Sequence, residues 1–112
     1  MVSELSTVTY DSIIIVMEFF DGIVLNKLIA ERDWQSDNKN DMSLRIKIWN
    51  AIEKEYDNWK KYNIRHNDLQ TQNILVSMNS GKILVKFIDP LVNPHYYDDE
   101  ILSGIEYRLL GE

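Results

Sequence analysis

A long amphipathic segment, residues 43–62, limits the possible folds of this chain more than any other part of the sequence. Its large apolar residues recur every three or four positions, at Leu44, Ile48, Ile52, Tyr56 and Trp59. This spacing matches the period of an α-helix and places the five side chains on one face, which Trp49 widens. We therefore predict that this segment is one helix and that its apolar face packs against the core.

Shorter elements are expected on both sides of this helix. Residues 7–20 predict a buried strand, because a mostly β-branched run over residues 13–17 lies at its centre and Asp21-Gly22 follows it. The other expected elements are a helix over 24–32, a polar loop over 35–41, strands over 74–76 and 83–88 joined by a turn at 79–81, and a helix over 99–110. This order contains no βαβ repeat and no Gly-rich phosphate loop, so the predicted fold class is α+β.

Length and composition exclude several classes of protein. The chain has 112 residues, enough for one domain with one core but too few for two. Its net charge of −6 argues against a nucleic-acid partner, and the absence of cysteine excludes disulfides and thiolate metal sites. The most apolar run, residues 13–17, is too short for a signal peptide or a membrane span. We therefore expect a cytoplasmic protein that binds neither nucleic acid nor a membrane.

The polar segment 66–73 is the sharpest functional signal, and it reads His-Asn-Asp-Leu-Gln-Thr-Gln-Asn. It offers a carboxylate at Asp68 and a carboxamide at Asn73. Asp89 stands at the far end of the expected hairpin, and a hairpin returns its end close to its start. Amide and carboxylate oxygens suit Mg²⁺, which binds few protein groups and keeps water or phosphate oxygens as its other ligands. The sequence therefore predicts a magnesium site at Asn73 and Asp89, with Asp68 facing it.

The same residues also have purely structural explanations. Asp68 and Asn73, taken alone, are residue types that cap loops and helix ends. Asp89-Pro90, taken alone, ends a strand, because proline cannot donate to a continuing ladder. The functional interpretation depends on all of these residues standing in register with His66 and Leu69.

This constellation resembles the protein-kinase-like superfamily, whose catalytic loop reads H-x-D-L-x-x-x-N. The match is letter for letter at His66, Asp68, Leu69 and Asn73. The resemblance implies that Asp68 is the catalytic aspartate that orients or deprotonates an acceptor hydroxyl. It implies that Asn73 and Asp89 are the two Mg²⁺ ligands that hold the ATP phosphates, and that His66 supports the loop rather than acting as a base.

The resemblance extends back to residues 15–22, which look like the last strand of the family's N-lobe and its hinge. It implies that the carbonyl of Glu18 and the amide of Phe20 contact adenine, with Met17 at the back of the pocket. The expected organisation is one partial kinase-like domain, in which residues 7–22 are the last N-lobe strand and hinge. Residues 23–112 then form the core of the C-lobe.

Departures from the family pattern point to a branch. The usual arginine of H-R-D is Asn67, so control through a phosphorylated activation loop is not expected. The usual lysine two residues after the aspartate is Gln70, and the usual D-F-G is Asp89-Pro90-Leu91. These features are more similar to the small-molecule branch, the choline-kinase and aminoglycoside-phosphotransferase-like enzymes, with the atypical protein kinases as the alternative branch.

Three hypotheses about function stay open at this stage. In the first, the chain is a fragment or reduced form of an ATP- and Mg²⁺-dependent phosphotransferase with an unknown hydroxyl acceptor. The Gly-rich loop and the ATP-clamping lysine are missing before the hinge, so we expect the chain alone to be weakly active. In the second, it is a catalytically inactive kinase-like module that binds a protein partner, or itself, through the exposed hinge strand. In the third, it is an ordinary α+β domain with a chance motif.

Overall fold

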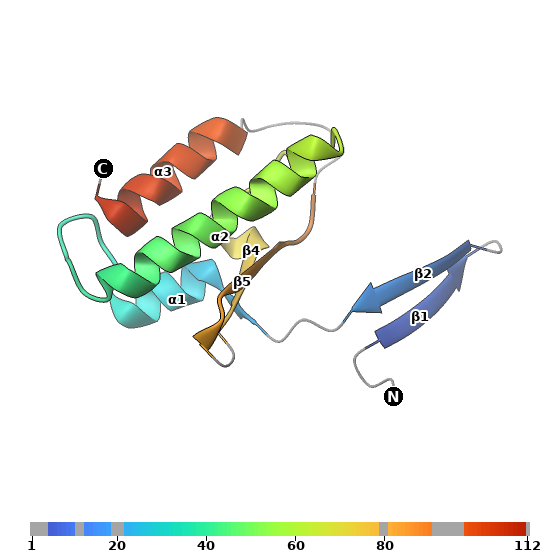
Figure 1. Ribbon diagram of the computed structural model, residues 1–112, viewed down its shortest axis with the longest axis horizontal. Coiled ribbons are helices and arrows are strands. Elements are labelled where there is room, and N and C mark those ends of the chain that lie inside the picture. Colours follow the sequence, from blue (N-terminus) through green and yellow to red (C-terminus); the bar gives the residue numbers. More distant parts are fainter. Residues whose placement is uncertain (1–4, 11–12, 19–21, 79–80, 91–97, 112) are drawn as a thin grey trace.

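The computed structural model describes residues 5–10, 13–18, 22–78, 81–90 and 98–111. Its elements are shown in Figure 1. In chain order they are β1 (Leu5–Tyr10), β2 (Ile13–Glu18), β3 (Ile23–Val24), α1 (Leu25–Arg32), α2 (Met42–Lys61), a 3₁₀ turn (Thr71–Asn73), β4 (Ile74–Ser77), β5 (Leu84–Phe87) and α3 (Asp98–Leu110). The predicted α+β class is confirmed, and the predicted helices agree with α1, α2 and α3 to within one residue at each end.

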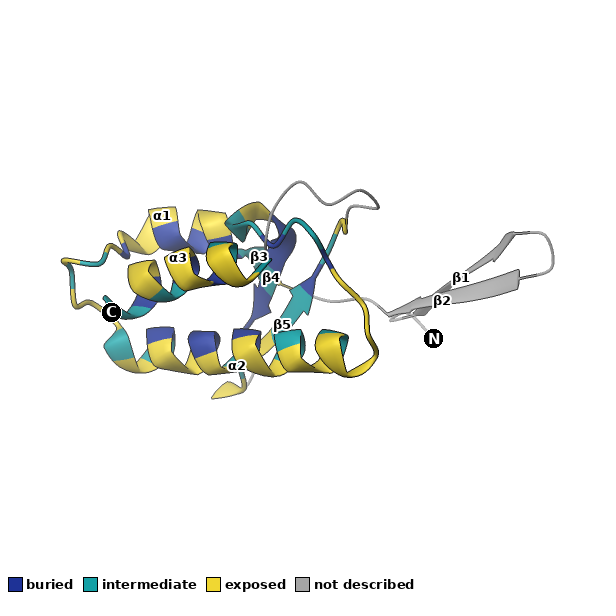
Figure 2. Ribbon diagram, turned by 90° about the horizontal axis from the view of Figure 1, so that it is seen from above, coloured by how far each residue is buried: buried dark blue, intermediate teal, exposed yellow. Residues whose placement is uncertain are grey.

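The main sheet has three antiparallel strands in the order β3–β4–β5. Ile74 pairs with Phe87 at one end of the β4–β5 ladder, and Ser77 pairs with Leu84 at the other. The helix α2 contacts β5 and also contacts α3, while α1 contacts β3 and β4 (Figures 1 and 2). The start of β4 and the end of β5 therefore meet at one edge of the sheet, which is where the candidate site lies.

The core confirms the apolar face predicted for α2. Ile48 and Ile52 are fully buried, Trp49 is nearly so, and Figure 2 shows the buried positions of α2 on the side that faces the other elements. The other helices contribute the remaining helical core residues, which are Leu25, Leu28 and Ile29 from α1 and Leu102, Ile105 and Leu109 from α3. Burial of these side chains stabilises the packing of all three described helices, at about 1.5–3 kcal/mol for each large side chain.

The expectation of one strand over residues 7–20 is wrong. The backbone forms two antiparallel strands instead, with Leu5 opposite Glu18 and Tyr10 opposite Ile13. The sequence explains the difference, because strand-forming residues lie on both sides of Asp11-Ser12, and Asp and Ser are residues that favour turns. This hairpin forms a sheet separate from β3–β4–β5, so the predicted hinge strand is not part of the sheet that carries the site (Figure 1).

A buried arginine holds the polar loop 35–41 against the helices. The Arg45 side chain is 1% exposed. Its guanidinium donates to the carbonyl oxygens of Gln35, Asn38, Asn40 and Arg108, at 2.9, 2.6, 3.1 and 2.8 Å. Burial lowers the pKa of this group from its usual value, and nearby Asp41 opposes that effect. One side chain of α2 therefore fixes the loop and the last turn of α3.

Asp41 precedes α2 but does not cap it with its side chain. Its carboxylate accepts a hydrogen bond from the indole Nε1 of the buried Trp34 at 3.0 Å, and Arg32 lies 3.6 Å from the same oxygen. Asp41 has a φ of 56°, which leaves its carboxylate facing Trp34. Aspartate at this position usually caps the helix, but the carboxylate of Asp41 binds the indole of Trp34 instead.

Alanine substitutions at Gly104, inside α3, and at Gly111, just after α3, are predicted to change the free energy of unfolding in opposite directions. Gly104 lies inside the helix with open space where a Cβ would be, so Gly104→Ala should raise the free energy of unfolding by about 0.5–1 kcal/mol. Gly111 has a φ of 77°, and a Cβ there would lie 3.0 Å from the carbonyl oxygen of Ser36. Gly111→Ala should therefore lower the free energy of unfolding by about 1–2 kcal/mol.

Urea unfolding of both glycine variants, followed by tryptophan fluorescence, measures the two changes under identical conditions. Each variant serves as the control for the other, because both add one methyl group to the same end of the protein. An unchanged or raised free energy of unfolding in Gly111→Ala would contradict the close packing of Gly111 against loop 35–41.

Candidate functional site

Loop 66–73, which follows α2, begins with a sharp reversal of the chain. The helix ends at Lys61, and the backbone N–H of Ile64 bonds back to the carbonyl of Trp59 at 3.0 Å. Asn63 adopts a positive φ of 60°, which a non-glycine residue reaches most easily as asparagine. This turn directs residues 66–73 across the open end of the β4–β5 hairpin.

His66 is the buried centre of the loop, with 1% of its surface exposed. Its Nδ1 accepts the backbone N–H of Asp68 at 3.1 Å, so the ring proton is on Nε2. Nε2 lies 2.5 Å from the carbonyl oxygen of Ile88 and donates to it. His66 therefore ties the residue before Asp89 to the backbone of Asp68, which is the geometry of a structural support.

Two aromatic side chains pack around the imidazole. The ring of Trp59 on α2 lies 5.2 Å from that of His66, and the ring of Phe87 on β5 lies 6.0 Å away. Trp59 and Phe87 also contact each other, with centroids 5.7 Å apart. The imidazole is therefore held by packing as well as by hydrogen bonds.

Asn73 and Asp68 are in direct contact. The amide nitrogen of Asn73 donates to the backbone carbonyl of Asp68 at 2.8 Å and to its carboxylate Oδ2 at 3.0 Å. Asn73 is 6% exposed, and its own N–H bonds to Gln70 across the 3₁₀ turn at 2.8 Å. Because the amide nitrogen is committed to Asp68, the amide oxygen is the end that remains for a ligand.

Asp89 follows directly after the residue that pairs with Asn73. The backbone N–H of Ile88 donates to the carbonyl of Asn73 at 2.9 Å. Asp89 is exposed, and its φ of 53° turns the chain away from the strand direction. The hairpin thus returns to the start of β4 as expected, and it brings Asp89 to the edge that carries Asn73.

The loop has a further anchor that the sequence did not predict. The backbone N–H of Asn67 donates to Oδ2 of Asp98, at the start of α3, at 2.9 Å. Asn67 has a φ of 69°, a left-handed conformation that costs energy and has to be held by its surroundings. In the sequence, Asp98 stands among three acids at the start of a helix, and a favourable interaction with the helix dipole explains that position equally well.

The residues present fit a magnesium ion by their chemistry. Among the described residues, no cluster of three or more His, Cys, Asp or Glu side chains is arranged to hold a metal. Mg²⁺ needs fewer protein ligands than such a cluster, because it keeps water and phosphate oxygens. Oδ1 of Asp68 is buried and has no hydrogen-bond partner within the described part of the chain, so the loop holds a carboxylate oxygen that a cation or a donor would satisfy.

Two of the three predicted adenine contacts, Met17 and Glu18, lie outside the sheet that carries this edge. Met17 and Glu18 lie in β2, where they stand opposite Ser6 and Leu5 in the separate hairpin. Phe20 lies outside the described residues. The nucleotide-base half of the predicted site therefore stays a prediction, while the structure brings Asp68, Asn73 and Asp89 to one edge.

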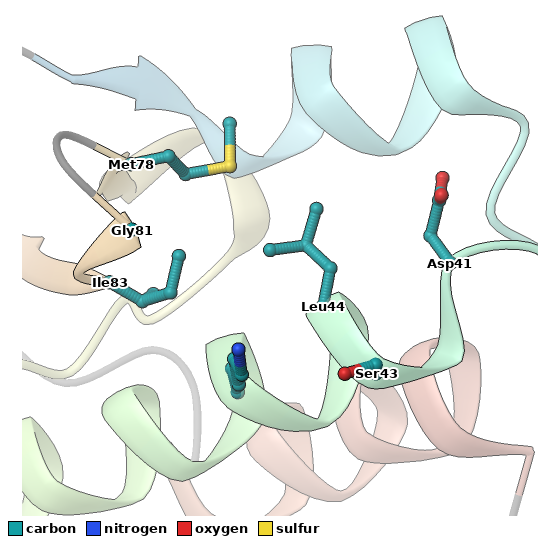
Figure 3. A pocket seen from close by; sticks show the side chains of 7 residues that line it. Asp41, Ser43, Leu44, Met78, Gly81 and Ile83 are labelled. Atoms are coloured by element: carbon teal, nitrogen blue, oxygen red, sulfur yellow. The ribbon is translucent and has the colours of Figure 1, made fainter.

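A pocket lies at the opposite, closed end of the β4–β5 hairpin. Its volume is about 380 Å³, and Figure 3 shows Leu44, Met78 and Ile83 pointing into a common space. Its other lining residues are Asp41, Ser43, Lys47 and Gly81. Because the strands that separate the two ends are four residues long, the pocket is about 13 Å from the candidate site and is not part of it.

Comparisons with known proteins neither support nor oppose a kinase relationship. The chain matches no protein-family model, no curated protein and no solved structure. Within the described part of the chain, no helix combines the length and the apolar character that a membrane crossing requires.

Proposed function

We propose that the edge formed by Asp68, Asn73 and Asp89 is the magnesium- and phosphate-binding centre of an ATP-dependent phosphotransferase. In this proposal the chain forms the core of a kinase-like C-lobe, and it acts in the cytoplasm. The observation that carries the proposal is the Asp68–Asn73 contact, in which the amide nitrogen of Asn73 donates and its amide oxygen takes no part, while Oδ1 of Asp68 is buried with no hydrogen-bond partner among the described residues. Both are oxygen ligands of the kind that hard cations prefer.

The proposed roles of these residues are those that the resemblance to the kinase-like superfamily implies. The amide oxygen of Asn73 and the exposed carboxylate of Asp89 would hold Mg²⁺, which neutralises charge on the ATP phosphates when bound. His66 keeps the two halves of the site in register by bonding Ile88 and Asp68. Asp68 would orient the acceptor hydroxyl and take its proton while the bond to the γ-phosphorus forms and the bond from that phosphorus to ADP breaks.

Binding and transfer assays with one substitution test this function. Asp89→Ala should weaken magnesium-dependent ATP binding about tenfold or more and abolish phosphate transfer, because it removes one of the metal's two proposed protein ligands. Asp37→Ala is the matched control, since it removes an equal charge from an exposed position in the polar loop. Equal ATP affinity in the two variants would contradict the proposed site.

A second function is favoured by the β1–β2 hairpin. A two-stranded hairpin alone is at best marginally stable, and its edges present unpaired backbone groups to another chain. Under this alternative the chain is an inactive kinase-like module that binds a protein partner or a second copy through the hairpin. Light scattering after size exclusion distinguishes the two, because a stable monomer that transfers phosphate is expected only of the enzyme.

A further inference from the structure

The first turn of α3 contacts both α2 and loop 66–73. On one side, the hydroxyl of Tyr56 on α2 donates to Oδ1 of Asp99 at 2.5 Å. On the other, Oδ2 of Asp98 accepts the backbone N–H of Asn67 at 2.9 Å. The two carboxylates are adjacent in sequence, while their partners are 43 and 31 residues away. This turn therefore joins α2 to the residue immediately before Asp68.

The bond from the Asn67 N–H uses one of the two carboxylate oxygens of Asp98. The other oxygen, Oδ1, is buried with no hydrogen-bond partner among the described residues, so it does not fix this carboxylate from a second side. Its position depends on where the first turn of α3 lies. Asn67 is in the left-handed conformation that requires such support, and the next residue is Asp68. A small shift of this turn would therefore be felt at Asp68.

We infer that Tyr56 is a positioning residue for Asp68: its hydroxyl holds the first turn of α3 through Asp99, and this turn holds the loop through Asp98. Only the kinetic consequence of this inference rests on the proposed phosphotransferase function. Sequence spacing alone explains Tyr56 as part of the apolar face of α2. The inference adds a role in the site for its hydroxyl.

The hydroxyl of Tyr56 is suited to donate this hydrogen bond over a wide pH range. Burial, and then the hydrogen bond to Asp99, raise the pKa of the Tyr56 phenol above its usual value, while Arg65 acts in the opposite direction. The phenol therefore keeps its proton throughout the pH range of ordinary assays. The ammonium group of Lys60 lies 4.7 Å from the centre of the same ring, which holds the ring by its face and leaves the hydroxyl to Asp99.

Tyr56→Phe tests the inference, because it removes the hydroxyl and keeps the packing of the ring. Amide hydrogen exchange in the full chain should become about fivefold faster at Asn67, as expected for the loss of one hydrogen bond that supports it. The amide of Ile88 serves as an internal reference, since it bonds to the carbonyl of Asn73 and not to a residue of α3. Tyr107→Phe, on the 55% exposed ring of α3, is the matched variant and should leave Asn67 unchanged.

The outcomes separate this inference from its alternatives. Faster exchange at Asn67 alone supports it. Unchanged exchange at Asn67, or an equal acceleration at Asn67 and Ile88, overturns it, because the second result reports only a general loss of stability. A protein that transfers no phosphate defeats the proposed function, while the exchange result still decides the role of Tyr56.

Kinetics provide a second readout if transfer is observed. A positioning role predicts that Tyr56→Phe lowers kcat about fivefold and leaves KM for Mg·ATP within about twofold, because the proposed metal ligands are untouched. Asp99→Asn, which keeps an oxygen acceptor for the hydroxyl, should retain most of the activity that Asp99→Ala loses. Equal loss in the two Asp99 variants would contradict the proposed connection.

Discussion

Replacing Arg45 with methionine is expected to lower the free energy of unfolding by about 3–5 kcal/mol. The guanidinium is buried and satisfies four carbonyl oxygens from the polar loop and the last turn of α3. Methionine fills much of the same space but donates no hydrogen bond, so these carbonyls must find water or remain unpaired. Urea unfolding followed by tryptophan fluorescence measures the change.

Arg45→Lys is the informative companion variant. Lysine keeps the charge but cannot reach several carbonyls at once with a planar fork, so we expect roughly half of the loss seen with methionine. Ile46→Ala, at an exposed position of the same helix, is the control for changes in α2 itself. A loss below about 1 kcal/mol in Arg45→Met would show that the polar loop does not depend on this side chain.

The second large effect is expected from His66→Phe, which should lower the free energy of unfolding by about 2–4 kcal/mol. Phenylalanine preserves the ring that packs on Trp59 and Phe87. It leaves the backbone N–H of Asp68 and the carbonyl of Ile88 without their partner in a buried place. The unpaired groups, rather than lost packing, therefore account for the predicted cost.

A comparison with His66→Ala separates packing from hydrogen bonding. Alanine removes the ring as well, so its additional cost over phenylalanine reports the contacts with Trp59 and Phe87. Both variants should also accelerate amide exchange at Asp68 and Ile88 more than at Arg45, whose N–H bonds within the start of α2 at 2.9 Å. Equal acceleration at all three amides would contradict the specific role of His66 in the loop.

The helices could be predicted because their signal is local. The apolar spacing in α2 and the turn residues around α1 depend on near neighbours in the chain, so periodicity locates them. The return of the β4–β5 hairpin follows from the same local logic, and it was enough to predict that Asn73 and Asp89 approach the same edge. Gly81 has a φ of 74°, as the predicted turn required.

Arg45 and Asp98 could not be predicted because their partners are distant in sequence. Arg45 stands between Leu44 and Ile46 on an amphipathic helix, where a charged residue is ordinarily a solvent-facing one. Its burial becomes visible only when the carbonyl of Arg108, 63 residues away, is placed beside it. Asp98 similarly looks like a residue that suits the dipole of α3, and its bond to Asn67 is invisible in the sequence.

The N-terminal strand shows how a local signal can mislead. Residues 7–20 contain enough strand-forming residues for one long strand or for two short ones. The resemblance to a kinase hinge favoured one strand, whereas the structure has β1 and β2 paired with each other. The adenine contacts assigned to Met17 and Glu18 depended on the single strand, so they remain predictions without structural support.

The central claim, a magnesium site at Asn73 and Asp89, is tested most directly by locating a bound metal ion. Mn²⁺ can replace Mg²⁺ at oxygen-rich sites, and it broadens the NMR signals of nearby nuclei. Sub-stoichiometric Mn²⁺ should broaden the side-chain amide of Asn73 and the backbone amides of Asp68 and Asp89 first, and Asp89→Ala should abolish that preference. Broadening that begins at the acidic first turn of α3, or that is unchanged in Asp89→Ala, would contradict the account.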